Sequence, residues 1–378
     1  MVNRLQHLHD AGVSIWLDDL SRELLESGEF ERLVRDSAVS GATSNPTIFA
    51  KAITGSERYD GQLRAAFDAG LEDPQDLFFE LALEDVRRAA TILRPSYDAS
   101  GGRDGFVSFE CTPDLADDAE ATVMQALEVR HRLADVPNLL IKVAATDAGI
   151  RAIQELTAGG VSVNVTLLFS LRRYEQTIGA YWDGLERRAG LGKSLAGITS
   201  VASFFVSRVD AEVDARLAAD SPLRGRIAIA NAQLAYTRYL ESLESSRWKA
   251  LRANGAKPQR PLWASTGTKD PGYSDVRYVE ALIAPDVINT MPSKTLRAYA
   301  DHGDVTGSLG ADASGAESLV SELARAHVDL DAISVDLERS GVESFRDSYG
   351  QLLRCIETRF ARLRPGDHTI AHSAGTGR

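Results

Sequence analysis

A lysine lies inside one of the most apolar segments of the sequence. Lys142 interrupts the run NLLIKVAAT at residues 138–146. Burial removes water from an amine and so favours its neutral form, which can attack a ketone and form a Schiff base that accepts electrons. A buried lysine can equally serve as a structural ion-pair partner, here of a carboxylate such as Glu110. The strand context alone leaves both interpretations open.

Polar side chains also stand at the ends of other short apolar runs. Asn164 and Thr166 are two residues apart, so on a strand they point to the same face and could orient a water or an imine substituent. Asp18 has the same parity as Trp16 and would face inward with it. The alternatives are a layer of polar filling for the first pair and a helix cap for Asp18.

A second group of residues is suited to binding an anion. Arg208 follows the run SVASFFVS, and Ser265 opens the loop STGTKDPGY, which contains Lys269. The fork of donors on arginine suits phosphate, and loops after late strands of a barrel commonly bind it. Together with Ser203, these residues would form an anion pocket, although each one alone is also typical of a solvated loop.

The elements that must position these residues alternate between short apolar runs and amphipathic stretches. The predicted strands are Ser14–Asp18, Gly41–Ser44, Gly105–Glu110, Asn138–Ala144, Val161–Thr166, Gly197–Ser203, Pro261–Ser265 and Asp286–Thr290. The predicted helices include Leu20–Val34, Asp76–Leu93, Leu115–Ala134 and Asp147–Leu156. Eight strands with intervening helices predict an α/β fold, a closed (β/α)8 barrel with parallel strands. An open doubly wound sheet is the alternative, but the first strand is not followed by the glycine-rich turn that such a sheet usually carries.

We expect one barrel domain over residues 1–378, because such a barrel needs about 250 residues and the remainder suits helical additions. A helical insertion is expected at 210–260 and a C-terminal helical extension at 313–362. Residues 366–378 have no apolar period and are expected to form a flexible tail.

Composition excludes several classes of protein. The chain has 54 acidic and 42 basic residues, a net charge of −12, which argues against a general nucleic-acid or anionic-membrane binder. The two cysteines, Cys111 and Cys355, form no disulfide framework, and no histidine motif is suited to zinc. No apolar run is long enough for a membrane-spanning helix or a secretory signal. We expect a soluble cytoplasmic protein with no metal.

Several motifs resemble those of transaldolases. The segments ATSNPTIF, LLIKVAAT, VNVTLLFS and SVASFFVSRVD occur in the order and spacing of that family, and LWASTGTKDP followed by DVINTMP is similar to its longer bacterial members. The resemblance extends over nearly the whole chain. It implies a (β/α)8 barrel of the Schiff-base aldolase type, with the reactive lysine on the fourth strand, where Lys142 falls.

The resemblance also implies a reaction and a set of roles. Transaldolases move a dihydroxyacetone unit reversibly from sedoheptulose 7-phosphate to glyceraldehyde 3-phosphate, giving erythrose 4-phosphate and fructose 6-phosphate in the pentose phosphate pathway. The matching positions are Lys142 for the Schiff base, Asp18 for the C4-hydroxyl proton, Glu110 and Thr166 for a catalytic water, Asn45 and Asn164 for the dihydroxyacetone part, and Ser203, Arg208 and Ser265 for the phosphate end.

One position departs from the family pattern. Gly267 stands where many members have an arginine, and Lys269 is its expected replacement. No cofactor is implied, and the expected partners are phosphorylated sugars, with the chain a monomer or a homodimer. Two alternatives remain: an aldolase that releases free dihydroxyacetone from fructose 6-phosphate, and a catalytically silent barrel that binds sugar phosphates.

Overall fold

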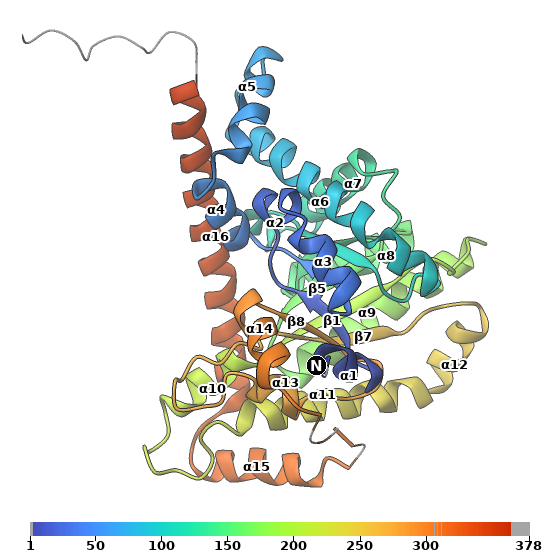
Figure 1. Cartoon of the computed structure of the whole chain (residues 1–378). Coiled ribbons are helices and arrows are strands. Elements are labelled where there is room, and N and C mark those ends of the chain that lie inside the picture. Colours follow the sequence, from blue (N-terminus) through green and yellow to red (C-terminus); the bar gives the residue numbers. More distant parts are fainter. Residues whose placement is uncertain (1–2, 306, 308, 311, 364–378) are drawn as a thin grey trace, which may run out of the picture.

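Eight parallel strands form a closed barrel in the order of the sequence (Figure 1). The computed structural model describes residues 3–363 apart from 306, 308 and 311. The strands are β1 (Ser14–Leu17), β2 (Val39–Thr43), β3 (Phe106–Glu110), β4 (Leu139–Ala144), β5 (Val163–Leu168), β6 (Ser200–Phe205), β7 (Gln259–Ala264) and β8 (Ile288–Met291). Each overlaps a predicted strand, and β1 pairs with β8, so the predicted (β/α)8 fold is confirmed and the open sheet is excluded.

Helices precede β1 and connect the strands up to β6. They are α1 (Arg4–Asp10), α2 (Arg22–Glu26), α3 (Glu29–Asp36), α4 (Pro46–Thr54), the 3-10 helix η1 (Glu57–Tyr59), α5 (Asp60–Asp68), α6 (Pro74–Ala99), the 3-10 helix η2 (Pro113–Leu115), α7 (Ala119–Arg132), α8 (Asp147–Gly159) and α9 (Leu171–Gly190). The single helix expected at Leu20–Val34 is wrong. Gly28 adopts φ 69° between α2 and α3, a left-handed conformation that ends one helix and redirects the chain before the next.

The connection between β6 and β7 is helical. It contains α10 (Ser207–Asp214), α11 (Ile227–Glu244) and α12 (Ser246–Ala253), while α13 (Arg277–Ala281) lies between β7 and β8. After β8 come α14 (Ser293–His302), α15 (Ser314–Arg325) and α16 (Leu330–Leu363). The tail expected at 366–378 lies outside the described residues, and the single-domain organisation of 1–378 stays a prediction. Within the described part of the chain, no helix combines the length and apolar character needed to cross a membrane.

The last helix, α16, passes across the carboxyl end of the barrel. Figure 1 shows it as a long red helix beside α4, and it also contacts α6, α10 and β5. Glu338 pairs with Arg173 of α9 at 3.0 Å, Arg346 donates to a carbonyl of η2 at 3.1 Å, and Arg359 donates to the carbonyl of Ile53 in α4. These anchors follow β5, β3 and β2 respectively, so α16 spans three of the connections that surround the barrel mouth.

Packing inside the barrel orients the first strand. Trp16 is fully buried, and its indole lies directly against Gly41 of β2. A Cβ atom at Gly41 would come within 2.5 Å of the ring, so only glycine permits this contact. The Trp16 Nε1 donates to Asp104 at 2.7 Å. Since Trp16 points into the barrel, Asp18, two residues further on, continues along the same inward face.

Candidate active site

Strands β3 and β4 bring Lys142 and Glu110 together at the barrel mouth. The two residues are in register, and the Lys142 Nζ lies 3.0 Å from Glu110 Oε2 and donates to the carbonyl of Ser44 at 3.1 Å. Both side chains are buried. Burial raises the pKa of Glu110, and the charge of Lys142 opposes that rise. The structural ion pair is therefore present, and it places a proton-exchanging carboxyl group beside the amine.

Asp18 lies at the same mouth, at the end of β1. It is partly exposed, and its Oδ1 accepts a hydrogen bond from Thr43 Oγ1 at 2.7 Å. Thr43 Oγ1 is also 2.7 Å from Thr290 Oγ1; because its one proton is donated to Asp18, the Thr290 hydroxyl must donate to Thr43. Burial raises the pKa of Asp18, and the charge of Lys142 acts against it. Asp18 is thus held in place as a carboxyl group that can take up a proton.

Asn164 is held from both sides inside the barrel. It is fully buried on β5, in register with Lys142. Its Nδ2 donates to Ser108 Oγ at 3.0 Å, and its Oδ1 accepts from Ser203 Oγ at 2.7 Å. These two contacts fix the orientation of the amide beside the reactive lysine.

Ser203 makes a contact that the sequence analysis did not predict. Its hydroxyl, 1% exposed on β6, donates to Asn164. The sequence analysis grouped Ser203 with Arg208 in an anion pocket. In the structure its hydroxyl bonds Asn164, the residue expected to contact the dihydroxyacetone part. Ser203 lies within β6, whereas Arg208 lies beyond the end of that strand, in α10.

Thr166 and Asn45 present polar groups at the mouth. Thr166 Oγ1 is buried without a hydrogen-bond partner in the described part of the chain. A buried hydroxyl without a partner is costly, so this atom is suited to a water or a substrate group. Asn45 caps α4 by accepting from the Ile48 amide at 3.0 Å. The cap occupies its Oδ1, so the Nδ2 group is the part of Asn45 suited to a ligand.

Arg208 contributes a partly buried cation to the mouth. Its guanidinium lies 5.3 Å from the centroid of the Phe205 ring. Burial lowers the pKa of Arg208, while the charges of Asp18 and Glu110 act in the opposite sense. The two carboxylates of Asp18 and Glu110 therefore favour the charged form of Arg208.

The loop after β7 lies beside Arg208. Ser265 adopts φ 55°, and its Oγ lies 3.0 Å from Ser207 Oγ at the start of α10. Lys269 is exposed, and with Ser207 it lines a cavity of about 430 Å³. The structure therefore brings Ser265 next to the β6–α10 junction, with Lys269 on the outer side of the same region. A Cβ at Gly267 would lie 3.2 Å from Thr295 Oγ1, which leaves little room for a larger residue there.

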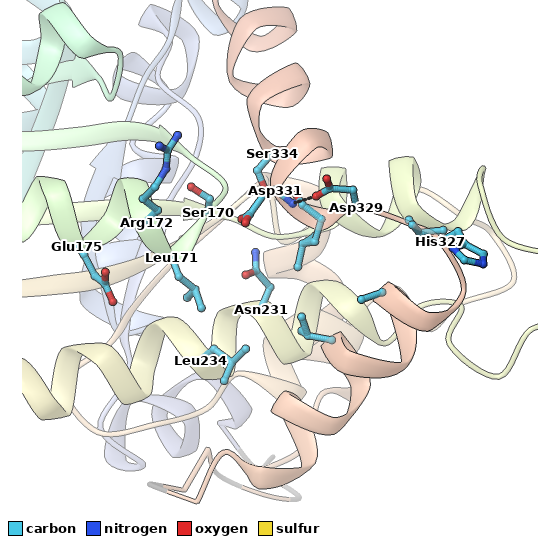
Figure 2. A pocket seen from close by; sticks show the side chains of 14 residues that line it. Ser170, Leu171, Arg172, Glu175, Asn231, Leu234, His327, Asp329, Asp331 and Ser334 are labelled. Carbon is cyan, nitrogen blue, oxygen red and sulfur yellow. Dashed lines mark hydrogen bonds between the residues drawn. The ribbon is translucent and has the colours of Figure 1, made fainter.

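A larger opening lies elsewhere. A cavity of about 670 Å³ is formed by α9, α11, α15 and the start of α16, and Figure 2 shows side chains that line it, including Arg172, Asn231 and Asp329. None of the predicted site residues lines this cavity. Across the described residues, no three His, Cys, Asp or Glu side chains come together in a way that could hold a metal ion.

Sequence reasoning missed several residues of the site. Ser108 shares its strand face with Glu110, two residues on, and this parity could have found it. Thr43 and Thr290 orient Asp18, and their signal is their position at strand ends. Phe345 of α16, whose ring centroid lies 6.0 Å from Lys142 Nζ, had no signal, because it occupies an ordinary apolar position of a helix.

A closed barrel with polar groups gathered at the carboxyl ends of its strands has the layout of a (β/α)8-barrel enzyme. Residues 15–356 match the transaldolase/fructose-6-phosphate aldolase family. The chain is 51% identical to a transaldolase of Saccharopolyspora erythraea over 94% of this chain and 97% of that protein. It is 49% identical to a transaldolase of Frankia alni (96% and 99%) and 46% identical to one of Mycolicibacterium smegmatis (92% and 95%). The chain belongs to the transaldolase/fructose-6-phosphate aldolase family, which confirms the resemblance seen in its motifs.

Proposed function

We propose that this enzyme is a transaldolase that works through a Schiff base on Lys142. It transfers a dihydroxyacetone unit from sedoheptulose 7-phosphate to glyceraldehyde 3-phosphate, giving erythrose 4-phosphate and fructose 6-phosphate. The observation that carries the proposal is the buried Lys142 amine, 3.0 Å from a carboxyl group whose pKa is raised by burial. Family membership and the names of the relatives support the same activity.

The reaction begins when the Lys142 amine adds to the ketone carbon, C2, of the donor sugar. Loss of water gives the iminium, and a water held between Glu110 and Thr166 is the partner for this step and its reverse. Thr166 suits this role because its buried hydroxyl has no hydrogen-bond partner among the described residues. Glu110 suits it because a carboxyl group of raised pKa can both give and take a proton.

Bond cleavage then requires a base at the C4 hydroxyl. Asp18 takes that proton, the C3–C4 bond breaks, and its electron pair moves into the iminium to give an enamine on Lys142. The aldehyde product leaves, a second aldehyde binds, and the enamine carbon attacks it while Asp18 returns a proton. Thr43 holds the carboxyl of Asp18 in position at 2.7 Å throughout.

Substrate binding is divided between two ends of the site. Asn45 and Asn164 bind the hydroxyls of the dihydroxyacetone part, and Ser203 keeps Asn164 oriented. Arg208 and Ser265 bind the phosphate, with Lys269 as a further cation on the outer side. The substrates are phosphorylated sugars; we further propose a cytoplasmic enzyme of the pentose phosphate pathway, active as a monomer or a homodimer.

A borohydride trap tests the proposal. Incubation with fructose 6-phosphate and borohydride is expected to fix a three-carbon adduct on the peptide that contains Lys142. The Lys142→Arg variant should lose both the adduct and turnover, whereas Lys257→Arg, which changes a lysine bonded to the carbonyls of Gly101 and Gly102, should keep both. Full turnover without an adduct on Lys142 would contradict the proposal.

Release of free dihydroxyacetone is the second candidate activity, because the matching family includes fructose-6-phosphate aldolases. Product analysis separates the two activities. A transaldolase forms sedoheptulose 7-phosphate when erythrose 4-phosphate is present with fructose 6-phosphate, and releases little dihydroxyacetone without an acceptor. An aldolase of the second kind releases dihydroxyacetone at the same rate with or without the acceptor.

A further inference from the structure

We propose that Phe345 of α16 determines whether the dihydroxyacetone unit is transferred or released, by covering the Schiff base on Lys142 with an apolar surface. This inference rests on the proposed transaldolase function and adds to it a residue outside the barrel that controls the fate of the intermediate. We call Gly341, Val342 and Phe345 the roof.

The roof lies directly above the reactive amine. The ring centroid of Phe345 is 6.0 Å from Lys142 Nζ, and Phe345 is 4% exposed. Val342 and Phe345 enclose, with Glu110, a cavity of only about 20 Å³. A space of that size holds about one water molecule. Lys142 and Glu110 are only 4% and 8% exposed beneath the roof, and the cavity leaves room for about one water beside Glu110.

Close packing holds the roof residues of α16 against the barrel. A Cβ at Gly341 would lie 3.0 Å from the Leu167 side chain and 3.7 Å from the Arg208 guanidinium, so a glycine lets α16 approach the barrel closely. Glu338, three residues before Gly341, makes two hydrogen bonds to Arg173 at 3.0 and 3.2 Å. Contacts before and after the roof therefore fix α16 on the barrel.

The opposite side of the mouth is more open. Asp18 at the end of β1 and Ser265 of the loop after β7 each keep part of their surface exposed, and Arg208 of α10 lies near Gly341 of the roof. The roof covers β3, β4 and β5 instead, through its contacts with Glu110, Lys142 and Leu167. Substrates then enter past Asp18 and the phosphate-binding residues, and the face of the intermediate under α16 is shielded.

Shielding from water matters because the enamine intermediate can react in two ways. After the C3–C4 bond breaks, the enamine carbon is two bonds from Lys142 Nζ. It either forms a new carbon–carbon bond with an aldehyde or accepts a proton. Protonation regenerates the iminium; one water then adds to C2, dihydroxyacetone leaves, and the amine returns to Lys142. An aromatic ring supplies no proton and displaces water that would, so the roof slows release relative to transfer.

The Phe345→Ala variant tests the proposal, and the same helix offers a matched control. Phe360 is also a buried phenylalanine of α16, packed against Phe67 with 5.7 Å between ring centroids, about four turns along the helix from Phe345. Both substitutions remove a buried ring from α16, but only the first opens space above Lys142. The measurement is the ratio of dihydroxyacetone released to sedoheptulose 7-phosphate formed, with fructose 6-phosphate as donor and erythrose 4-phosphate as acceptor.

Phe345→Ala is expected to raise this ratio by roughly tenfold, which corresponds to a change of 1.36 kcal/mol between the two competing barriers. Phe360→Ala should lower thermal stability but leave the ratio unchanged. Phe345→Leu, which keeps an apolar side chain of large volume, should stay near the wild-type ratio and serves as the folded variant if the alanine form is unstable. Phe345→Tyr keeps the ring, places a hydroxyl at the roof and should raise release.

The outcomes separate this inference from the proposed function. If wild type gives the three-carbon borohydride adduct on Lys142 but Phe345→Ala and Phe345→Tyr keep the wild-type ratio, Phe345 has only a structural role and the inference is overturned. The same holds if Phe360→Ala raises the ratio equally, since loosening of α16 anywhere would then suffice. If wild type gives no adduct on Lys142, the proposed function fails and the inference falls with it.

Discussion

Replacing Ser203 by alanine separates the two ends of the substrate site. The Ser203 hydroxyl donates a hydrogen bond to Asn164 Oδ1 at 2.7 Å. Loss of this hydroxyl leaves the buried Asn164 Oδ1 without its donor and frees the amide to turn. The damage should therefore fall on the dihydroxyacetone part of the substrate, which every donor shares, and not on its phosphate.

The size of the effect follows from burial. Ser203 is 1% exposed and Asn164 is fully buried, so water does not replace the lost donor easily. An unsatisfied buried acceptor costs about 1–3 kcal/mol. Because each 1.36 kcal/mol is a factor of ten in rate, loss of this contact in the transition state corresponds to roughly 5- to 150-fold in kcat/KM.

The assay compares kcat/KM for fructose 6-phosphate with that for unphosphorylated fructose. Ser203→Ala is expected to reduce both by the same factor, whereas Arg208→Ala should reduce only the value for the phosphorylated donor. Ser200→Ala is the matched control, since this buried serine lies on the same strand but bonds Gln259 at 2.7 Å, away from Lys142. A loss in Ser203→Ala confined to the phosphorylated donor would refute the reasoning and return Ser203 to the phosphate end.

Three further changes have defined outcomes. Thr43→Val removes a hydrogen bond that favours the Asp18 carboxylate, so the pKa of Asp18 should rise further and the acid limb of kcat/KM should move to higher pH; an unmoved limb contradicts this. Burial raises the pKa of Asp210 to about 6 from 3.8, so between these values the folded state binds more protons than the unfolded state and stability falls as pH rises. The free energy of unfolding is lower by ~3 kcal/mol at neutral pH than at acid pH because of Asp210. Urea unfolding at several pH values should show this decrease in the wild type and not in Asp210→Asn; an identical pH dependence in both proteins would rule it out. Gly41→Ala places a Cβ 2.5 Å from the Trp16 ring and should lower the free energy of unfolding by about 1–3 kcal/mol. A variant with the same urea midpoint as the wild type would contradict this.

The barrel could be predicted because its signals are local. Each strand is a short apolar run between polar turns, and parallel strands place their carboxyl ends at one mouth. The same rule predicts that Asp18, Glu110 and Lys142 meet there, and the ion pair between the last two confirms that these two do. The split of Leu20–Val34 was missed because one left-handed glycine, Gly28, outweighs the apolar pattern around it.

The finer parts of the site depend on packing that no local pattern encodes. The hydrogen bond from Ser203 to Asn164 joins two different strands, so the spacing of Ser203 and Arg208 along the chain could not indicate it. Ser108 was overlooked although its alternation with Glu110 places both on one face of β3. Phe345 lies near Lys142 only because α16 folds back over the barrel, a contact between distant parts of the chain.

The path of α16 has a consequence for how the enzyme is made. All eight strands precede it in the chain, since β8 ends at Met291 and α16 begins at Leu330. Synthesis therefore completes the barrel segments before the ring of Phe345 emerges from the ribosome. During that interval the nascent chain already carries Lys142 but lacks the ring of Phe345 that lies near it. The order of elements along the chain therefore makes α16 the last part of the site to be synthesised.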